Sequence, residues 1–184
     1  MSYQLSTYDV IKALSFEPWL ILIGVITIAA IAMYKAGVIG RHWPVLLIVA
    51  IFVFGVFRCS IQECVGDGWR LEGNKLTFKA WEEHAIIDLS ATRITLADTV
   101  GPWQPVRSTY RYGTPGLTAG WFTLQNGEKA VIFYHRKPTK MLVLFYDNRI
   151  FILAHPGVER LYHELIALGV REQGGIERAP GIAK

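Results

Sequence analysis

Residues 121–153 read WFTLQNGEKAVIFYHRKPTKMLVLFYDNRIFIL, and this stretch predicts the class of fold. Apolar and β-branched residues fill four short runs, which are 121–125, 129–134, 140–146 and 149–153. Asn126-Gly127 separates the first two runs, and Asp147-Asn148 separates the last two. Both dipeptides tolerate the positive φ angles of a type I′ turn, which is a common two-residue connection between antiparallel strands. The stretch therefore predicts two successive β-hairpins.

Strand patterns also precede this stretch, and a helical pattern follows it. Apolar residues alternate with polar ones in segments 76–80, 86–89 and 93–96. After Pro156, apolar residues recur at helical spacing until Gly169, and these are Val158, Leu161, Tyr162, Leu165 and Leu168. We expect about seven antiparallel strands in a barrel or orthogonal sandwich, capped by one C-terminal helix.

Two uncharged apolar stretches lie before the strand-like region. They run from Pro18 to Tyr34 and from Trp43 to Phe57, and they contain 17 and 15 residues. A helix needs roughly 20 apolar residues to cross a bilayer, and about 17 is the lower limit. The stretches predict a membrane-spanning helical hairpin, with a buried globular hairpin as the alternative. The hydrophobic content of 52% is higher than an ordinary core explains, and it favours the membrane interpretation.

The pattern divides the chain into five expected parts. An amphipathic N-terminal segment, 1–17, is expected to contain a short helix from Ser6 to Phe16. The remaining parts are a transmembrane hairpin at 18–57, a juxtamembrane linker at 58–68, a β domain at 69–169 and a flexible tail at 170–184.

The only two cysteines, Cys59 and Cys64, bear on the compartment. In an oxidising compartment this pair would close a short disulfide loop, whereas free thiols in a cytoplasmic linker are the alternative. The loop 35–42 carries Lys35 and Arg41 but no acid, which favours a cytoplasmic position for that loop. We therefore expect a multi-pass protein of the bacterial inner membrane whose β domain lies outside the cytoplasm.

Residues 111–122 read RYGTPGLTAGWF, a run rich in glycine and proline. Gly113, Gly116 and Gly120 allow positive φ angles or close backbone approach, and Pro115 fixes a turn. A tight loop that feeds the central hairpin explains the pattern without any ligand.

This run, followed by two hairpins and the helix after His155-Pro156, resembles the bacterial pleckstrin-homology-like domains that are attached to transmembrane helices. The resemblance covers roughly 69–168. It implies a seven-stranded barrel with a capping helix and a non-enzymatic scaffold or binding role. It does not imply a phosphoinositide site, because the corresponding loop at 79–84 contains Glu82 and Glu83, which would repel a phosphate.

Two groups of residues are candidate binding surfaces. The first group can grip a carboxylate or a partner's backbone, although arginine stems also pack over barrel mouths, and it comprises Arg107, Tyr110, Arg111 and Tyr112. The second group is basic and is a candidate for contact with an acidic partner or anionic headgroups; it comprises Lys129, Arg136, Lys137 and Lys140. A solvated hairpin tip is the alternative interpretation of the second group.

The sequence contains no recognisable catalytic constellation, and we expect no cofactor and no metal. Nucleic acid is not an expected partner, since the net charge of +4 is dispersed along the chain. The expected function is that of a membrane-anchored, non-enzymatic binding protein, an accessory or regulatory subunit of a membrane complex. The alternative is an immunity protein that neutralises a membrane-directed toxin at the outer face of the inner membrane. The expected partners are the lipid bilayer and a protein.

Overall fold

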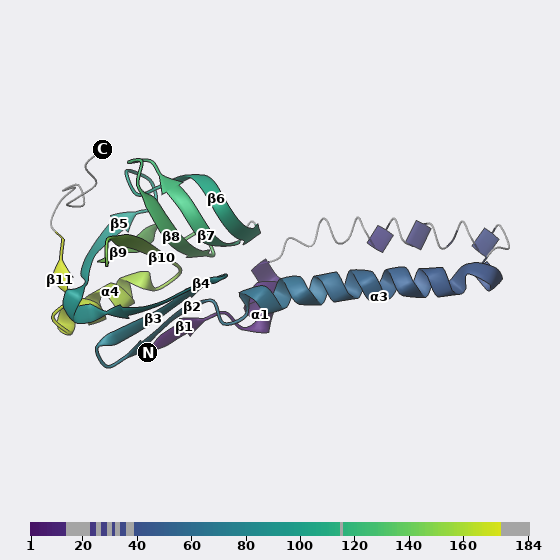
Figure 1. Cartoon of the computed structure of the whole chain (residues 1–184), viewed down its shortest axis with the longest axis horizontal. Helices are drawn as coiled ribbons and strands as arrows, with labels where there is room; N and C mark the ends of the chain where they lie inside the picture. The colour runs from purple at the N-terminus through teal and green to yellow at the C-terminus, as the bar shows by residue number, and fades with distance from the viewer. Residues whose placement is uncertain are drawn as a thin grey trace.

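The structure is a computed structural model, and it describes residues 1–13, 23–24, 27–28, 31, 34–35, 39–114 and 116–173. The described part is a mainly-β domain with a long helix projecting from one end (Figure 1). Its elements are, in chain order, β1 (Ser2–Gln4), α1 (Thr7–Ala13), α3 (Ile39–Cys64), β2 (Gly68–Glu72), β3 (Lys75–Ala80), β4 (Glu83–Asp88), the 3-10 helix η1 (Leu89–Ala91), β5 (Arg93–Asp98), β6 (Pro105–Thr114), β7 (Leu117–Leu124), β8 (Lys129–His135), β9 (Lys140–Tyr146), β10 (Arg149–Ala154), α4 (Val158–Ala167) and β11 (Arg171–Glu172).

The strands form two open sheets. One sheet has the order β1-β2-β3-β4, and the other has the order β11-β5-β9-β10-β8-β7-β6. The mainly-β fold with a C-terminal helix is confirmed, but the closed seven-stranded barrel is wrong. β10 turns back from β9 and lies between β9 and β8, where it runs parallel to β8 with Ile150 opposite Ala130. Nearly every residue of β10 is buried, which favours this central position over a position at an edge.

Both hairpin turns form where the sequence predicted them. Asp147 and Asn148 have φ angles of 49° and 55°, as a type I′ turn requires, and they join β9 to β10. The turn between β7 and β8 spans 125–128 and is not the predicted type I′ turn, because Gly127 has a φ angle of 87° but Asn126 does not have a positive φ angle. The predicted terminal helix is α4, and Gly169 follows it in the left-handed conformation typical of a helix end.

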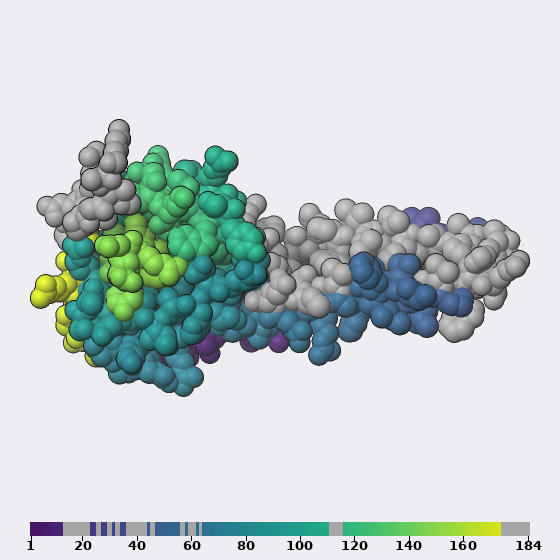
Figure 2. Space-filling view, in the orientation of Figure 1, coloured from purple at the N-terminus to yellow at the C-terminus, as the bar shows by residue number. Residues whose placement is uncertain are grey.

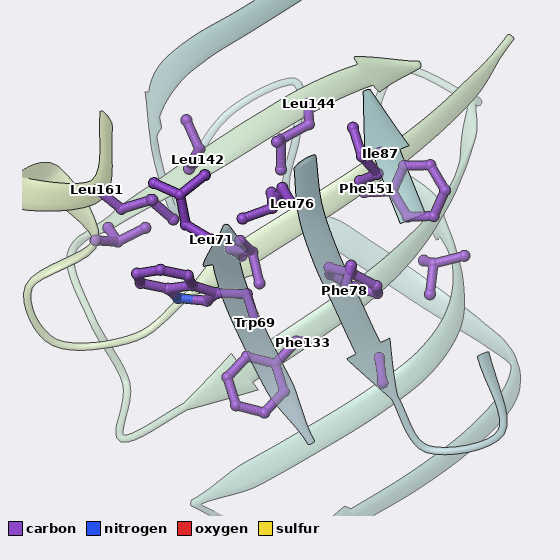
Figure 3. Close-up of a cluster of buried hydrophobic side chains, with 14 of the residues drawn as sticks. Trp69, Leu71, Leu76, Phe78, Ile87, Phe133, Leu142, Leu144, Phe151 and Leu161 are labelled. Carbon is purple, nitrogen blue, oxygen red and sulfur yellow. The ribbon is translucent and has the colours of Figure 1, made fainter. Parts of the chain in front are cut away.

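Side chains from both sheets and from α4 meet in one core. Trp69, Leu76 and Phe78 from the smaller sheet point toward Phe151 of β10 and its neighbours (Figure 3). The alternate residues of β8, β9 and β10 face the other way and form a second cluster, onto which Trp103 packs from the β5–β6 connection. Burial on both faces explains why these three strands read as continuous apolar runs rather than as alternating patterns.

The N-terminal residues are part of the β domain. β1 pairs antiparallel with β2, and the amide of Leu5 extends this contact by donating to the carbonyl oxygen of Asp67 at 2.9 Å. Leu5 and Val10 are buried in the core. α1 begins after a reciprocal cap between Ser6 and Asp9, in which each backbone N–H donates to the other side chain. The short amphipathic helix is confirmed over 7–13, and the remainder of its predicted range lies outside the described residues.

The prediction of two membrane-spanning helices is wrong. Most of the stretch from Pro18 to Tyr34 lies outside the described residues, and the stretch from Trp43 to Phe57 lies within α3. Among the helices in the described ranges, none combines the length and the apolar character that crossing a bilayer requires. The 15-residue apolar run of α3 falls below the lower limit of about 17 residues. The multi-pass inner-membrane location and the transmembrane hairpin therefore have no support.

The predicted disulfide between Cys59 and Cys64 is also wrong. Both residues lie in α3, which is helical throughout Ile39–Cys64. Five steps along an α-helix separate two Cα atoms by roughly 8.7 Å, whereas a disulfide needs a separation below about 7 Å. No disulfide occurs among the residues that the structure describes. The argument for an exported domain that rested on this bond falls with it.

Candidate functional site

The two sheets in the described part of the chain have four edge strands, which differ in length and charge. β1 and β11 contain three and two residues, and β4 contains six, including Glu83 and Asp88. β6 contains ten residues, and among the described strands it pairs only with β7. Long edge strands present unpaired backbone N–H and C=O groups to solvent, so β6 is the most extensive free edge among these four strands.

A groove of about 530 Å³ lies beside β6. Its lining residues come from three neighbouring strands, and they are Pro105, Val106, Arg107, Ser108, Thr118, Phe122, Ile132 and Tyr134. Val106 is 60% exposed at the rim, whereas Phe122 and Ile132 are buried in the floor. Figure 2 shows the β6–β8 part of the domain at the molecular surface.

Strand register explains why these side chains converge. Ser108 of β6 lies opposite Phe122 of β7, and Thr118 of β7 lies opposite Tyr134 of β8. Thr118, Gly120 and Phe122 share one face of β7, because alternate residues of a strand point the same way. Gly120 contributes no side chain to the centre of this row, and its φ angle of 128° is one that favours glycine. The missing side chain helps to keep the groove open.

The polar groups of the groove are available to a ligand. Arg107 is exposed and forms no ion pair with any described residue. The hydroxyls of Ser108 and Thr118 and the phenol of Tyr134 complete the polar lining. Burial raises the pKa of Tyr134, so this phenol remains protonated at neutral pH and can donate a hydrogen bond.

Tyr110 belongs to the opposite face of β6. It lies opposite Trp121 and stacks on Trp81 from the β3–β4 turn, with 4.3 Å between the ring centroids. Its hydroxyl donates to a carboxylate oxygen of Glu82 at 3.4 Å. Two bulges in β6, between Pro105 and Arg107 and between Ser108 and Tyr110, disturb the usual alternation. The predicted cluster is therefore divided, with Arg107 at the groove and Tyr110 on the other face.

The remaining predicted residues of this segment are partly described. The backbones of Arg111 and Tyr112 lie in β6, opposite Gly120 and Ala119, while their side chains lie outside the described set. Gly113 also lies in β6, Gly116 lies in the β6–β7 turn, and Pro115 lies outside the described residues. Thr114 pairs with Leu117, so β6 and β7 form a hairpin with a short connection.

The predicted basic patch does not form one surface. Lys129 begins β8, whereas Arg136 and Lys137 follow its other end, about 20 Å away at the usual rise per residue. Arg136 forms an ion pair with Asp9 of α1 at 2.9 Å, and Lys140 forms one with Asp98 of β5 at 2.8 Å. These pairings leave Lys129 and Lys137 as separate exposed charges.

A buried polar cluster escaped the sequence analysis. The hydroxyl of Tyr3 lies 2.6 Å from Nδ1 of His135, and the Trp69 indole N–H donates to Nε2 of His155 at 2.8 Å. Nδ1 of His155 lies 2.9 Å from the carbonyl oxygen of Pro156, so it carries the proton and donates it. Burial lowers the pKa of both histidines, that of His135 to about 4. Only the fold brings these distant residues together, so no local sequence signal could have identified the cluster.

Asp67 is a second buried polar residue, and it holds the turn that carries Trp81. Its carboxylate accepts a hydrogen bond from the Trp81 backbone N–H at 2.8 Å and lies 3.3 Å from the Lys79 ammonium. Trp81 has a φ angle of 56°, which is unusual for a residue with a side chain. Burial raises the pKa of Asp67 to about 6 despite these favourable contacts. No residue of either cluster is among those that line the groove.

Comparison with known proteins gives no relative: no protein-family model, no curated protein and no solved structure matches this chain. The assignment to pleckstrin-homology-like proteins with two transmembrane helices is therefore corrected to a mainly-β domain. The expectations of a membrane protein and of an immunity protein likewise receive no support from any relative.

Proposed function

We propose that this chain is a non-enzymatic binding protein that holds a protein partner along β6 and the groove beside it. The observation that carries the proposal is the position of β6, the longest edge strand in the described part of the chain, directly beside the groove. An extended segment of another chain can add to such an edge through main-chain hydrogen bonds. Side-chain pockets next to the edge then provide specificity.

The two bulges divide β6 into parts with different tasks. From Arg111 to Thr114 the pairing with β7 is regular, so the outer edge of this part can accept an added strand. From Pro105 to Ser108 the bulges interrupt the pairing and re-aim side chains, four of which line the groove. Bulges also discourage unselective edge-to-edge pairing. This division supports recognition of one partner segment rather than general aggregation.

Photocrosslinking tests the proposal in cells that produce the chain. A photoreactive amino acid replaces the exposed Val106 in one variant and the exposed Glu72 of β2 in a control variant. We expect a discrete adduct from position 106, none from position 72, and loss of the adduct when Thr118→Trp fills the groove. Equal adducts from both positions, or an adduct from position 106 that survives Thr118→Trp, would contradict the proposal.

A further inference from the structure

We infer that the segment bound at this site is an acidic, extended peptide strand that places an apolar side chain in the groove and a carboxylate beside Arg107. This inference rests on the proposed function and specifies the chemistry of the partner at the same site. It is carried by the charge distribution around β6 and by the composition of the groove lining.

The charge distribution around β6 is one-sided. Residues 99–127, which contain β6, β7 and the β6–β7 turn, include Arg107 and Arg111 but no aspartate or glutamate. Glu128 ends the β7–β8 connection, where its carboxylate accepts a hydrogen bond from the Asn126 side-chain amide at 3.2 Å. Glu82 and Glu83 bond to Tyr110 and Trp121 on the opposite face of the sheet. Glu83 also forms an ion pair with Arg149 at 2.9 Å. Their charges are therefore engaged away from the groove.

Arg107 provides the anchor for an acid. Its guanidinium has a planar set of donors that suits a carboxylate, and no described residue neutralises it. Among the described residues that line the groove, no other is charged, and the remaining polar side chains are those of Ser108, Thr118 and Tyr134. These hydroxyls can donate to carbonyl or carboxylate oxygens. A basic segment would meet only repulsion from Arg107.

The apolar part of the lining provides the second contact. Pro105 and Val106 form one wall, and Phe122 and Ile132 form the floor. An aliphatic or aromatic side chain that enters the groove would cover Val106, which is otherwise 60% exposed. Because side chains of an extended strand alternate, an acidic residue next to the apolar one would lie at the rim, where Arg107 lies.

A nucleic acid is a poorer occupant of this site. Nucleic-acid sites combine several basic residues along a track, whereas the described lining of the groove includes one arginine. A small free carboxylate could bind Arg107, but it could not form main-chain hydrogen bonds along the regular part of the β6 edge. The edge and the groove together therefore favour a peptide strand.

A matched pair of peptides tests the inference by fluorescence anisotropy with the full chain. In one labelled peptide glutamate alternates with leucine, and in its twin lysine replaces each glutamate. We expect the acidic peptide to bind and the basic twin to bind at least about fivefold more weakly, with a difference that shrinks as salt is added. Arg107→Glu should reverse the preference. Arg70→Glu, which changes an exposed arginine in the other sheet, should leave it unchanged.

The possible results separate this inference from the proposed function. Equal binding of both peptides, lost in Thr118→Trp, would overturn the acidic preference and leave β6 as a binding edge. Displacement of the acidic peptide by an equal concentration of octanoate would also overturn the inference, because a small carboxylate would then be sufficient. Binding of neither peptide, or binding that Thr118→Trp does not weaken, would overturn the inference and remove its support for the proposed site.

Discussion

The phenol ring of Tyr3 lies flat against the imidazole of His155, with 4.0 Å between the ring centroids and 17° between the ring planes. This contact joins the first strand of the domain to the connection between β10 and α4. The Tyr3 hydroxyl also contacts His135 at the end of β8. One side chain of a three-residue strand thus helps to hold the N-terminal segment against the larger sheet.

Tyr3→Phe should lower the free energy of unfolding by about 1 kcal/mol, because it removes the hydrogen bond to His135 and keeps the stacked ring. Chemical denaturation measures this difference. Tyr8→Phe is the matched control, since Tyr8 is 69% exposed, and it should have no measurable effect. Equal effects of the two substitutions would show that the Tyr3 hydroxyl adds no stability.

His135 should make the domain sensitive to acid. Burial and the neighbouring Arg136 lower its pKa to about 4, while Asp9 opposes this shift. The folded state therefore keeps His135 neutral after the unfolded chain has bound a proton near pH 6.5, so stability falls as the pH drops from about 6.5 to about 4. The full contribution of this residue is about 3 kcal/mol. Relative to wild type, His135→Asn should gain stability over this pH range, as measured by denaturation at several pH values. A constant difference between the two proteins would contradict the assignment.

Protonation of Asp67 should stabilise the folded protein, whereas protonation of His135 should destabilise it. Its pKa is raised from 3.8 to about 6 in the folded state, so the folded protein binds a proton before the unfolded chain does. The stability from this group is fully present below pH 3.8 and is lost as the pH rises through about 6. Relative to Asp67→Asn, wild type should therefore gain up to about 3 kcal/mol as the pH falls from 7 to 4. The same titration series measures this change, and a trend of the opposite sign would contradict it.

Asn148→Gly should stabilise the hairpin between β9 and β10. Asn148 has a φ angle of 55°, and glycine occupies this conformation without steric cost. We expect a gain of about 0.5 kcal/mol, whereas Asn148→Val should cost more than this gain because a β-branched residue is strained there. Thermal denaturation compares the two variants. A loss of stability in the glycine variant would contradict this prediction. It would show that the contacts of the Asn148 side chain stabilise the protein by more than its positive φ angle destabilises it.

Local signals in the sequence predicted the hairpins and the terminal helix. Asp147-Asn148 and Gly169 each specify their own backbone conformation, so no distant contact is needed to interpret them. Asn126-Gly127 marked the position of its hairpin but not the conformation of the turn. The insertion of β10 between β9 and β8 depends on contacts across the sheet, which spacing along the chain does not reveal. β6 was not predicted because Gly113 and Pro115 resemble a loop, although Gly113 lies within β6, which continues to Thr114.

The binding residues were also predicted only in part, because their arrangement depends on contacts between strands. Arg107 was identified because an arginine beside aromatic residues suggested recognition of an acid, and the structure places it at the groove. Phe122, Ile132 and Tyr134 were missed, because their role depends on the register of three strands. Lys129 and Arg136 were grouped because they are close in sequence, but an extended strand keeps them apart. The membrane prediction relied on hydropathy, but the 15-residue apolar run of α3 is too short to cross a bilayer.

Amide hydrogen exchange along β6 tests the central claim most directly. The full chain is exchanged with and without a saturating concentration of the peptide in which glutamate alternates with leucine. The account predicts slower exchange at amides between Arg111 and Thr114, where the added strand pairs, and unchanged exchange at the edge strand β4. Exchange along β6 that is unchanged while the peptide is bound, or protection confined to β4, would contradict the account.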